Sequence, residues 1–358
     1  MDAAARGGAG AHGHPDSRRH EFPKQGTASV GVARQYCGAR GKVANCQTAV
    51  TVALWTGARA WLLGATLYLP EEWLTRRQRS RAQIPAAVAF APKWQLALTL
   101  LRQVRAARVT ITAVVGDAEF GDNATLRRTL HRAKLPYALG VSSDLNVFLG
   151  TPALEAPPPS GTGRPRTRWR LPPDTHAIEA RAWAAAQPSR RWRLVSWRNG
   201  TNPPWRARFC AVRVTPAHDW RDGRRLAPEV WLLCERELAG GDRVRYYLVD
   251  LPATASLRAL VRLAHQRWAI EQQYQELKDE IGLDHFEGRT LPGWQRHVVL
   301  TAIAYSLLQN ERRRRGQTTL TLPRVRAVIQ EVLTAHFFMT QPHYLKWMLK
   351  LKEVELRN

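Results

Sequence analysis

Charged side chains recur along the segment at residues 256–289, SLRALVRLAHQRWAIEQQYQELKDEIGLDHFEGR. Arg267, Glu271 and Lys278 lie four and then seven residues apart, and at 3.6 residues per turn these steps return each side chain to the same face of a helix. They form a cation–carboxylate–cation stripe that offers charged groups for chemistry. The alternative is an ordinary solvated helix face with intrahelical ion pairs.

A second acidic residue, Asp117, follows an apolar and β-branched run. Residues 109–115, VTITAVV, predict a strand buried on both faces, and GDAEFGDN comes directly after it. Asp117 is therefore expected at the carboxyl end of a central strand, where open α/β sheets expose their reactive groups. Both Asp117 and Asp122 could instead cap the next helix. We favour chemistry for Asp117 and capping for Asp122.

The stripe requires a helix, and the pattern predicts one over residues 256–289. Ser256 can cap its start and Gly282 can end it. An apolar stripe runs beside the charged one and consists of Leu263, Ile270, Tyr274, Leu277 and Ile281.

The elements before this helix are predicted from periodicity. A strand at 43–55 and a hairpin partner at 60–69 lead into a basic loop at 71–85 and an amphipathic helix at 93–106. A helix at 123–135 and a strand at 137–148 follow, and then an exposed loop rich in Pro, Gly and Arg at 151–173.

Strand-like segments with interleaved Trp and Arg recur at 189–200, 203–214, 228–238 and 243–252. This alternation fits a DNA-binding surface and fits half-buried antiparallel strands equally well. A second helix at 294–315 ends in the arginine cluster 312–315, which is either a solvated helix end or a phosphate contact. Short helices are predicted within residues 317–358.

Composition limits the class of protein. The 358 residues carry 54 Lys and Arg against 29 Asp and Glu, a formal charge of +25, so a polyanion is the expected partner unless a GC-rich genome alone raised the arginine count. The four cysteines have no paired metal-ligand spacing, which argues against a zinc finger or a disulfide framework. No apolar run is long enough for a membrane span and no signal segment is present, so a cytoplasmic protein is expected.

Several motifs carry a resemblance to a known family. The R-W-A-I-E segment with its following Lys278, and the stretches GLDHFEGR, FPKQG, SVGVARQYCG and GKVANCQ, resemble DDE transposases of the bacterial insertion-sequence 4 superfamily, in its insertion-sequence 701-like branch. The resemblance implies an α/β fold, a ribonuclease H-like catalytic domain interrupted by a β-rich insertion domain, with C-terminal helices. The implied parts are a non-homologous, unstructured segment (1–21), the first part of the catalytic domain (22–151), the insertion (152–253), the signature helix with the second part (254–316) and a helical tail (317–358).

The resemblance also implies a mechanism for cut-and-paste transposition. Asp117 and Glu271 would be catalytic carboxylates that bind two Mg²⁺ (or Mn²⁺) ions, which suits the preference of these ions for oxygen ligands. Arg267 and Lys278 would hold phosphates of double-stranded DNA, namely the terminal inverted repeats and the target. A homodimer on DNA and a location at the bacterial nucleoid, without a membrane, would follow.

The sequence departs from the family at two places. Ala264 stands where relatives often carry Tyr, and Arg19 stands where they carry the first catalytic Asp. Codons for residues 18–20 could read Asp-Asp-Thr in the neighbouring frame. We therefore expect a truncated or frameshifted, inactive copy, and the alternative function is a non-catalytic, basic DNA-binding remnant. A sugar- or protein-binding β-module has support only from the inserted strands.

Overall fold

The computed structural model describes residues 21–37, 40–57, 59–156, 169–198, 205–217, 220, 225–238, 243–314, 321–344 and 346–348. The predictions about residues 1–20, including Arg19, lie outside this range. The chain divides into two compact units, which are described separately. Among the described residues the first unit comprises Glu21, Thr48–Pro70 and Ala89–Glu271, and the second comprises Phe22–Gln47, Glu71–Val88 and the residues from Gln272 onward.

The amino-terminal strands form a four-stranded sheet around one long strand. Its order is β1-β3-β2, with β4 also paired to β3. The elements are β1 (Glu21–Pro23), β2 (Ala33–Cys37), β3 (Lys42–Trp55) and β4 (Ala60–Leu67). The predicted strand and its hairpin partner are confirmed, because β3 and β4 pair antiparallel from Ala49 opposite Leu67 to Trp55 opposite Ala60.

The predicted basic loop at 71–85 is wrong. It contains a 3₁₀ helix, η1 (Glu71–Leu74), and a short α-helix, α1 (Arg76–Ala82). The Thr75 side chain caps α1 by accepting from the Gln78 N–H, and Gln83 ends it in the left-handed region at φ 51°. The polar composition of this segment favoured a loop in the sequence analysis, but Thr75 and Gln83 supply the capping signals of a short helix. The amphipathic helix that was predicted next is confirmed as α2 (Lys93–Ala106).

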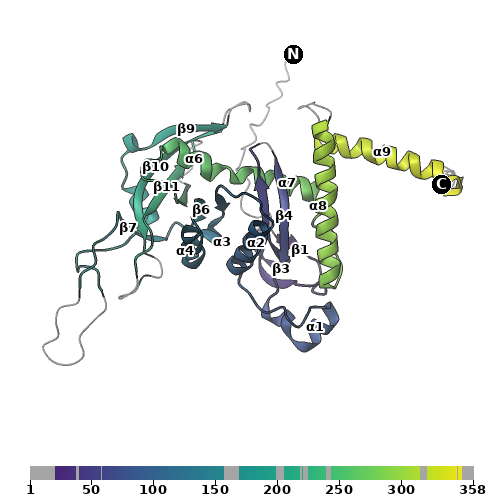
Figure 1. The fold of residues 1–358 in the computed structure, drawn as a ribbon, viewed down its shortest axis with the longest axis horizontal. Coiled ribbons are helices and arrows are strands. Elements are labelled where there is room, and N and C mark those ends of the chain that lie inside the picture. Colours follow the sequence, from purple (N-terminus) through teal and green to yellow (C-terminus); the bar gives the residue numbers. More distant parts are fainter. Residues whose placement is uncertain are drawn as a thin grey trace, which may run out of the picture. The chain divides into compact units, whose positions relative to one another are not determined.

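The remaining strands form one eight-stranded sheet (Figure 1). Its order is β5-β6-β12-β11-β10-β7-β8, with β9 paired to β10, and only β5 and β6 are parallel among the pairs described. The strands are β5 (Val114–Gly116), β6 (Tyr137–Val141), β7 (Asn146–Leu149), β8 (Ile178–Glu179), β9 (Arg193–Arg198), β10 (Trp205–Pro216), β11 (Val230–Arg236) and β12 (Val244–Val249). The four Trp- and Arg-rich segments are thus confirmed as strands, and they share a sheet with β5 and β6.

Two strand predictions need correction. Only Val114 and Val115 of the run 109–115 belong to β5, whose residues are partly exposed. β5 lies at the end of the described sheet order, not at its centre. The stretch 137–148 is two strands, β6 and β7, joined by a turn in which Leu145 N–H donates to Ser142 O at 3.3 Å. Ser and Asp side chains favour such turns over a continuous strand.

Both faces of the eight-stranded sheet are covered in part by helices. One core cluster joins strand residues such as Leu232 to residues of α2, α4 (Ala124–Arg132) and α5 (Ala180–Ala185). A second cluster joins Phe209 and Leu233 to Leu260 and Val261 of α6 (Leu257–His265). Because successive strand residues point to opposite faces, these clusters lie on the two sides of the sheet. The order helix, sheet, helix is a mixed α/β architecture.

The single helix predicted at 256–289 is wrong, because the structure contains two helices. The chain forms α6, breaks at Gln266, and continues as α7 (Arg267–Asp279). At the break, 3₁₀-type bonds replace α-helical ones: Gln266 N–H donates to Leu263 O, and Ala269 N–H donates to Gln266 O, both at 3.2 Å. The predicted ends are confirmed, since Ser256 caps α6 and Gly282 follows α7 with φ +72°.

The second unit contains the long helices α8 (Leu291–Arg314) and α9 (Leu322–Thr340). The helix predicted at 294–315 is confirmed as α8, whereas α9, with 19 residues, is longer than the short helices predicted within residues 317–358. The cluster at 312–315 lies outside the described side chains. Buried Lys24 ties the amino-terminal strand region to the segment after α7, because its Nζ donates to Asp284 O at 3.0 Å, Phe286 O at 2.6 Å and Glu287 Oε1 at 3.0 Å. A single ammonium group thus joins FPKQG to GLDHFEGR.

All four cysteines, Cys37, Cys46, Cys210 and Cys234, are free and buried, which confirms the prediction that they form no disulfide framework. In the part of the chain that the structure describes, no helix has the length and apolar character needed to cross a membrane.

Candidate active site

Asp117 occupies the turn between β5 and the short helix α3 (Ala118–Gly121). The turn packs closely against β6, because a Cβ on Gly121 would lie only 1.7 Å from Gly140 O. Glycine is therefore required where α3 meets the strand, and this contact fixes the position of Asp117. Asp117 is the N-cap residue of α3, but its side chain makes no capping hydrogen bond there.

The environment of Asp117 is that of a reactive carboxyl group. Although the residue is partly exposed, its Oδ1 atom is buried and has no hydrogen-bond partner among the described residues. Burial raises the pKa of Asp117, and the opposing influence of the Arg267 charge is smaller. A buried oxygen without a donor is a site that a cation would satisfy.

Asp122 has a different role from the one predicted. It lies at the end of α3, and its Oδ1 accepts from the Ser142 N–H at 2.9 Å. Asn123, not Asp122, caps α4 by accepting from the Leu126 N–H. The prediction that Asp122 caps the next helix is therefore wrong by one residue, since the adjacent Asn is equally suited to capping.

Glu271 lies on α7, one turn after Arg267. It is 7% exposed, and the Arg267 guanidinium forms an ion pair with its Oε1. The pairing confirms that the first two members of the stripe share a helix face. Because the side chain of Arg267 remains 26% exposed, this arginine can also meet a ligand.

Asp117, Arg267 and Glu271 line one pocket of about 240 Å³ in the first unit. Two carboxylates that are far apart in the sequence thus line the same cavity, together with one positively charged arginine. The rest of the lining comes from Ala118, Gly140, Val141, Ser143, residues 243–247, Ala264, His265 and Trp268. This volume is below that of a typical drug-sized ligand site, but it can admit a phosphate group with its counterions.

Lys278 belongs to the second unit. Its Nζ lies 5.0 Å from the centroid of the Phe22 ring, a cation–π contact within its own unit. The pocket is lined entirely by residues of the first unit, so the structure gives Lys278 a packing role and leaves its DNA contact a prediction.

Sequence reasoning missed Glu235, which lies on β11 behind the pocket wall. It is 1% exposed, and its Oε1 is 3.3 Å from Arg245, its Oε2 is 2.9 Å from the Tyr247 hydroxyl, and Oε2 is 3.4 Å from His265 Nε2. The Arg245, Tyr247 and His265 side chains all belong to residues that line the pocket. Glu235 therefore orients three lining residues at once.

The ionised state of Glu235 is strongly favoured. Burial alone would raise its pKa, but His265, Arg245 and the Tyr247 hydroxyl together lower it to about 2. His265 is held further by stacking on Trp197, with ring centroids 3.8 Å apart. An acidic residue inside the apolar segment VWLLCEREL was the available sequence signal, because an unpaired charge is costly to bury.

A divalent ion fits this donor set in part. Asp117 and Glu271 supply hard oxygen ligands, and Asp117 Oδ1 lacks a donor. A group of three or more His, Cys, Asp or Glu residues placed to hold a metal ion is not found among the described residues. The pocket thus offers two of the three carboxylates that the resemblance implies.

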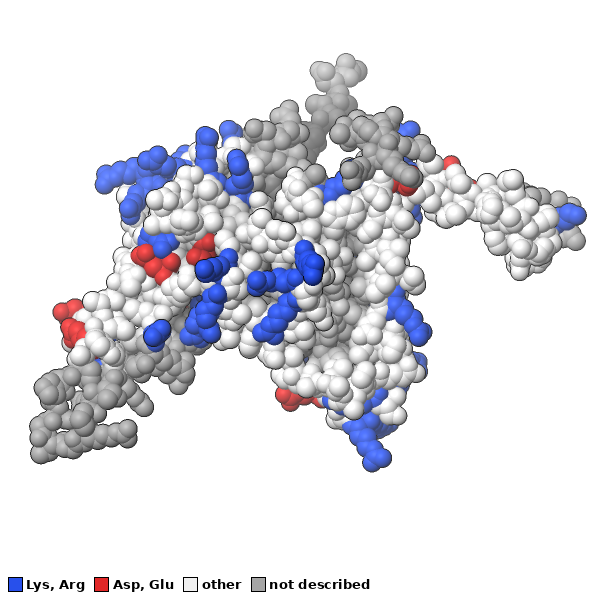
Figure 2. All heavy atoms as spheres, viewed as in Figure 1, with Lys and Arg blue, Asp and Glu red and all other residues white. Residues whose placement is uncertain are grey.

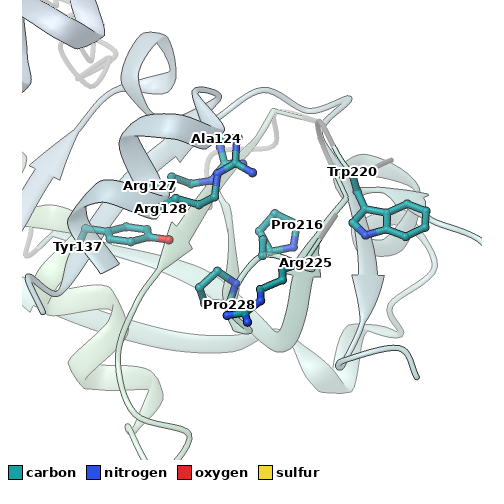
Figure 3. Close-up of a pocket in the computed structure, with 9 residues that line it drawn as sticks. Ala124, Arg127, Arg128, Tyr137, Pro216, Trp220, Arg225 and Pro228 are labelled. Carbon is teal, nitrogen blue, oxygen red and sulfur yellow. The ribbon is translucent and has the colours of Figure 1, made fainter. Parts of the chain in front are cut away.

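A second pocket of the first unit is smaller and has no acidic lining residue. It encloses about 20 Å³, and Figure 3 shows Arg127 and Arg128 across from Pro216, Pro228 and Arg225. This volume is close to that of a single water molecule, so the pocket is too small for a phosphate group. The larger pocket is therefore the candidate active site.

A mixed α/β protein with carboxylates and arginines in one pocket is suited to metal-assisted chemistry on an anionic substrate. The family described as "DDE superfamily endonuclease" matches residues 21–204, just over half of the chain. The chain therefore belongs to this family, which places it among transposase-type nucleases with DNA as the substrate class. Enzymes of the superfamily use divalent metal ions. A search of curated proteins found no match.

Asp117 lies within the matched region, residues 21–204, whereas Arg267 and Glu271 lie after it. Assignment of these two residues as site residues therefore depends on the shared pocket and on the resemblance of the signature helix.

Proposed function

We propose that this chain is a transposase of a bacterial insertion sequence, from the insertion-sequence 701-like branch of the insertion-sequence 4 superfamily. The observation that carries the proposal is the pocket shared by Asp117, Arg267 and Glu271. Family membership supports DNA as the substrate. The formal charge of +25 supports binding of a polyanion.

In this proposal the two carboxylates are ligands of divalent ions, Mg²⁺ or Mn²⁺. When bound, such ions would screen the charge that develops on a scissile phosphate and activate the attacking oxygen. Arg267 would orient the phosphate at the pocket, and Lys278 would hold a neighbouring phosphate. Glu235 would keep Arg245, Tyr247 and His265 in place at the pocket wall.

We further propose that this copy binds DNA without cleaving it. The reason is the resemblance, in which Arg19 occupies the place of the first catalytic Asp. Only Asp117 and Glu271 supply carboxylates among the described residues that line the pocket. The second candidate function, a non-catalytic and basic DNA-binding remnant, has its support in the same two observations.

The test is incubation of the purified chain with duplex DNA that carries the element's terminal repeats, in the presence of Mn²⁺. Binding without strand cleavage is the expected result. Cleavage would refute the inactivity, and absence of any DNA binding would refute the transposase assignment.

The metal assignment is tested separately by electron paramagnetic resonance of bound Mn²⁺. Asp117→Asn should weaken Mn²⁺ binding, whereas Asp174→Asn, an exposed matched control, should leave it unchanged. Equal Mn²⁺ affinity of the wild type and Asp117→Asn would remove Asp117 from the proposed ligand set.

A further inference from the structure

Three arginines on β10 and β11 share one face of the eight-stranded sheet, in the part of the sheet where β9 pairs with β10. Arg206 and Arg208 are two residues apart on β10 and both are exposed, so they point to the same side of the sheet. Arg236 on β11 is the register partner of Arg208. We call Arg206, Arg208 and Arg236 the arginine face.

These arginines lack an acidic partner within the described part of the chain. None of them forms an ion pair with a residue that the structure describes, and their register neighbours on the adjacent strands are Ser196, Leu194 and Val244. The Arg208–Arg236 pair places like charges directly opposite each other, which destabilises a sheet. An external anion would remove this cost.

The opposite face of the same strands shows a different arrangement. There Glu235 of β11 lies in register with Arg245 of β12, and the two form an ion pair at 3.3 Å. Glu235 and Arg245 thus neutralise each other within the protein, whereas Arg206 and Arg208 on the other face are exposed to solvent. Protection of a sheet edge does not explain the arginine face, because β10 and β11 each pair with strands on both sides.

Arg236 is held in position without loss of its charge. Its guanidinium lies 4.1 Å from the centroid of the Trp192 ring, and Trp192 is buried beneath it. Stacking of this kind orients the planar group while its N–H donors remain available for a phosphate. The side chain is therefore arranged for an anion before one binds.

The surroundings favour a phosphate backbone over unpaired bases. Apart from the Arg208–Arg236 pair itself, the register neighbours of the three arginines are the aliphatic or hydroxyl residues Leu194, Val244 and Ser196, and the nearby Trp192 is buried. Proteins that bind single strands present aromatic rings for base stacking, whereas duplex binding depends on phosphate contacts. Figure 2 shows Lys and Arg side chains gathered over the region of β9 and β10.

We propose that the arginine face binds the phosphate backbone of duplex DNA, independently of base sequence and apart from the catalytic pocket. This inference rests on the proposed function, because it assumes a DNA substrate. It adds a contact surface on strands β10 and β11, beyond the end of the matched family region at residue 204.

The test compares binding of the wild type and of Arg206→Gln/Arg208→Gln to a duplex as a function of salt. Loss of two phosphate contacts should lower the slope of log K against log [salt] by about 2 and weaken binding at low salt on the order of tenfold. The loss should be equal for duplexes with and without the terminal repeats. The matched control is Arg102→Gln/Arg105→Gln, which removes two exposed arginines of α2 and should change neither quantity.

Three results would overturn the inference: an unchanged salt slope in Arg206→Gln/Arg208→Gln, an equal loss in the α2 control, or a loss confined to single-stranded DNA. Circular dichroism of both variants establishes that they are folded, and Arg208→Lys, which keeps the charge, should retain most of the binding. Failure of the wild type to bind duplex DNA would refute the proposed function instead, so the two failures are distinguishable.

Discussion

Replacement of Glu235 by Gln tests whether one buried carboxylate holds the pocket wall. The change keeps the size of the side chain but removes the charge that Arg245, Tyr247 and His265 surround. Because Glu235 is 1% exposed, water cannot replace the lost interaction. We therefore expect a large loss of stability in the first unit.

The magnitude follows from the pKa. The pKa of Glu235 falls from 4.5 to about 2 on folding, and each pKa unit corresponds to roughly 1.4 kcal/mol. The ionised group thus stabilises the folded state by about 3 kcal/mol. Since the folded pKa is the lower one, this contribution is present in full above pH 4.5 and is lost as the pH falls toward 2.

The assay is urea unfolding followed by circular dichroism at pH 7 and at pH 3. At pH 7 the free energy of unfolding of Glu235→Gln should be about 3 kcal/mol below that of the wild type, and at pH 3 about half of this difference should remain. The control is Glu237→Gln, because Glu237 is 39% exposed and contacts only Arg245 among the residues of this network. The control should lose less than about 1 kcal/mol.

A wild-type and a Glu235→Gln protein of equal stability at pH 7 would refute the reasoning. So would a difference that grows between pH 7 and pH 3, because the sign of the pKa shift requires it to shrink.

Two further substitutions test the contacts that position the site. Gly121→Ala should destabilise the protein by about 3 kcal/mol in thermal melting, because the new Cβ would collide with Gly140 O. The control Gly26→Ala should be tolerated, because no atom lies within 4 Å of its Cβ position. Equal melting temperatures of the two variants would exclude the close α3–β6 contact. Lys24→Met should lower the free energy of unfolding by about 2–3 kcal/mol, because it removes three hydrogen bonds of a buried ammonium group. Lys42→Met, at an exposed position, should lower it little. Equal losses in urea unfolding would contradict the anchoring role of Lys24.

The sequence by itself determined the elements whose signals are local. Alternation placed β3 and β4, and helical periodicity placed α2 and α8. Ser256 and Gly282 marked helix ends because capping and positive φ depend on the residue itself and its immediate neighbours. Asp117 was correctly expected after a strand for the same reason.

Only the tertiary structure decided which distant groups meet. The break at Gln266 left no signal in the helical pattern, and the short β5 was concealed in an apolar run that could equally have been a longer strand. Glu235 and Arg245 became partners through the register of β11 and β12. Alternation shows that a strand has two faces, but the pairing of strands determines which side chains each face receives. The pocket and the arginine face therefore depend on pairings between residues that are separated in the chain.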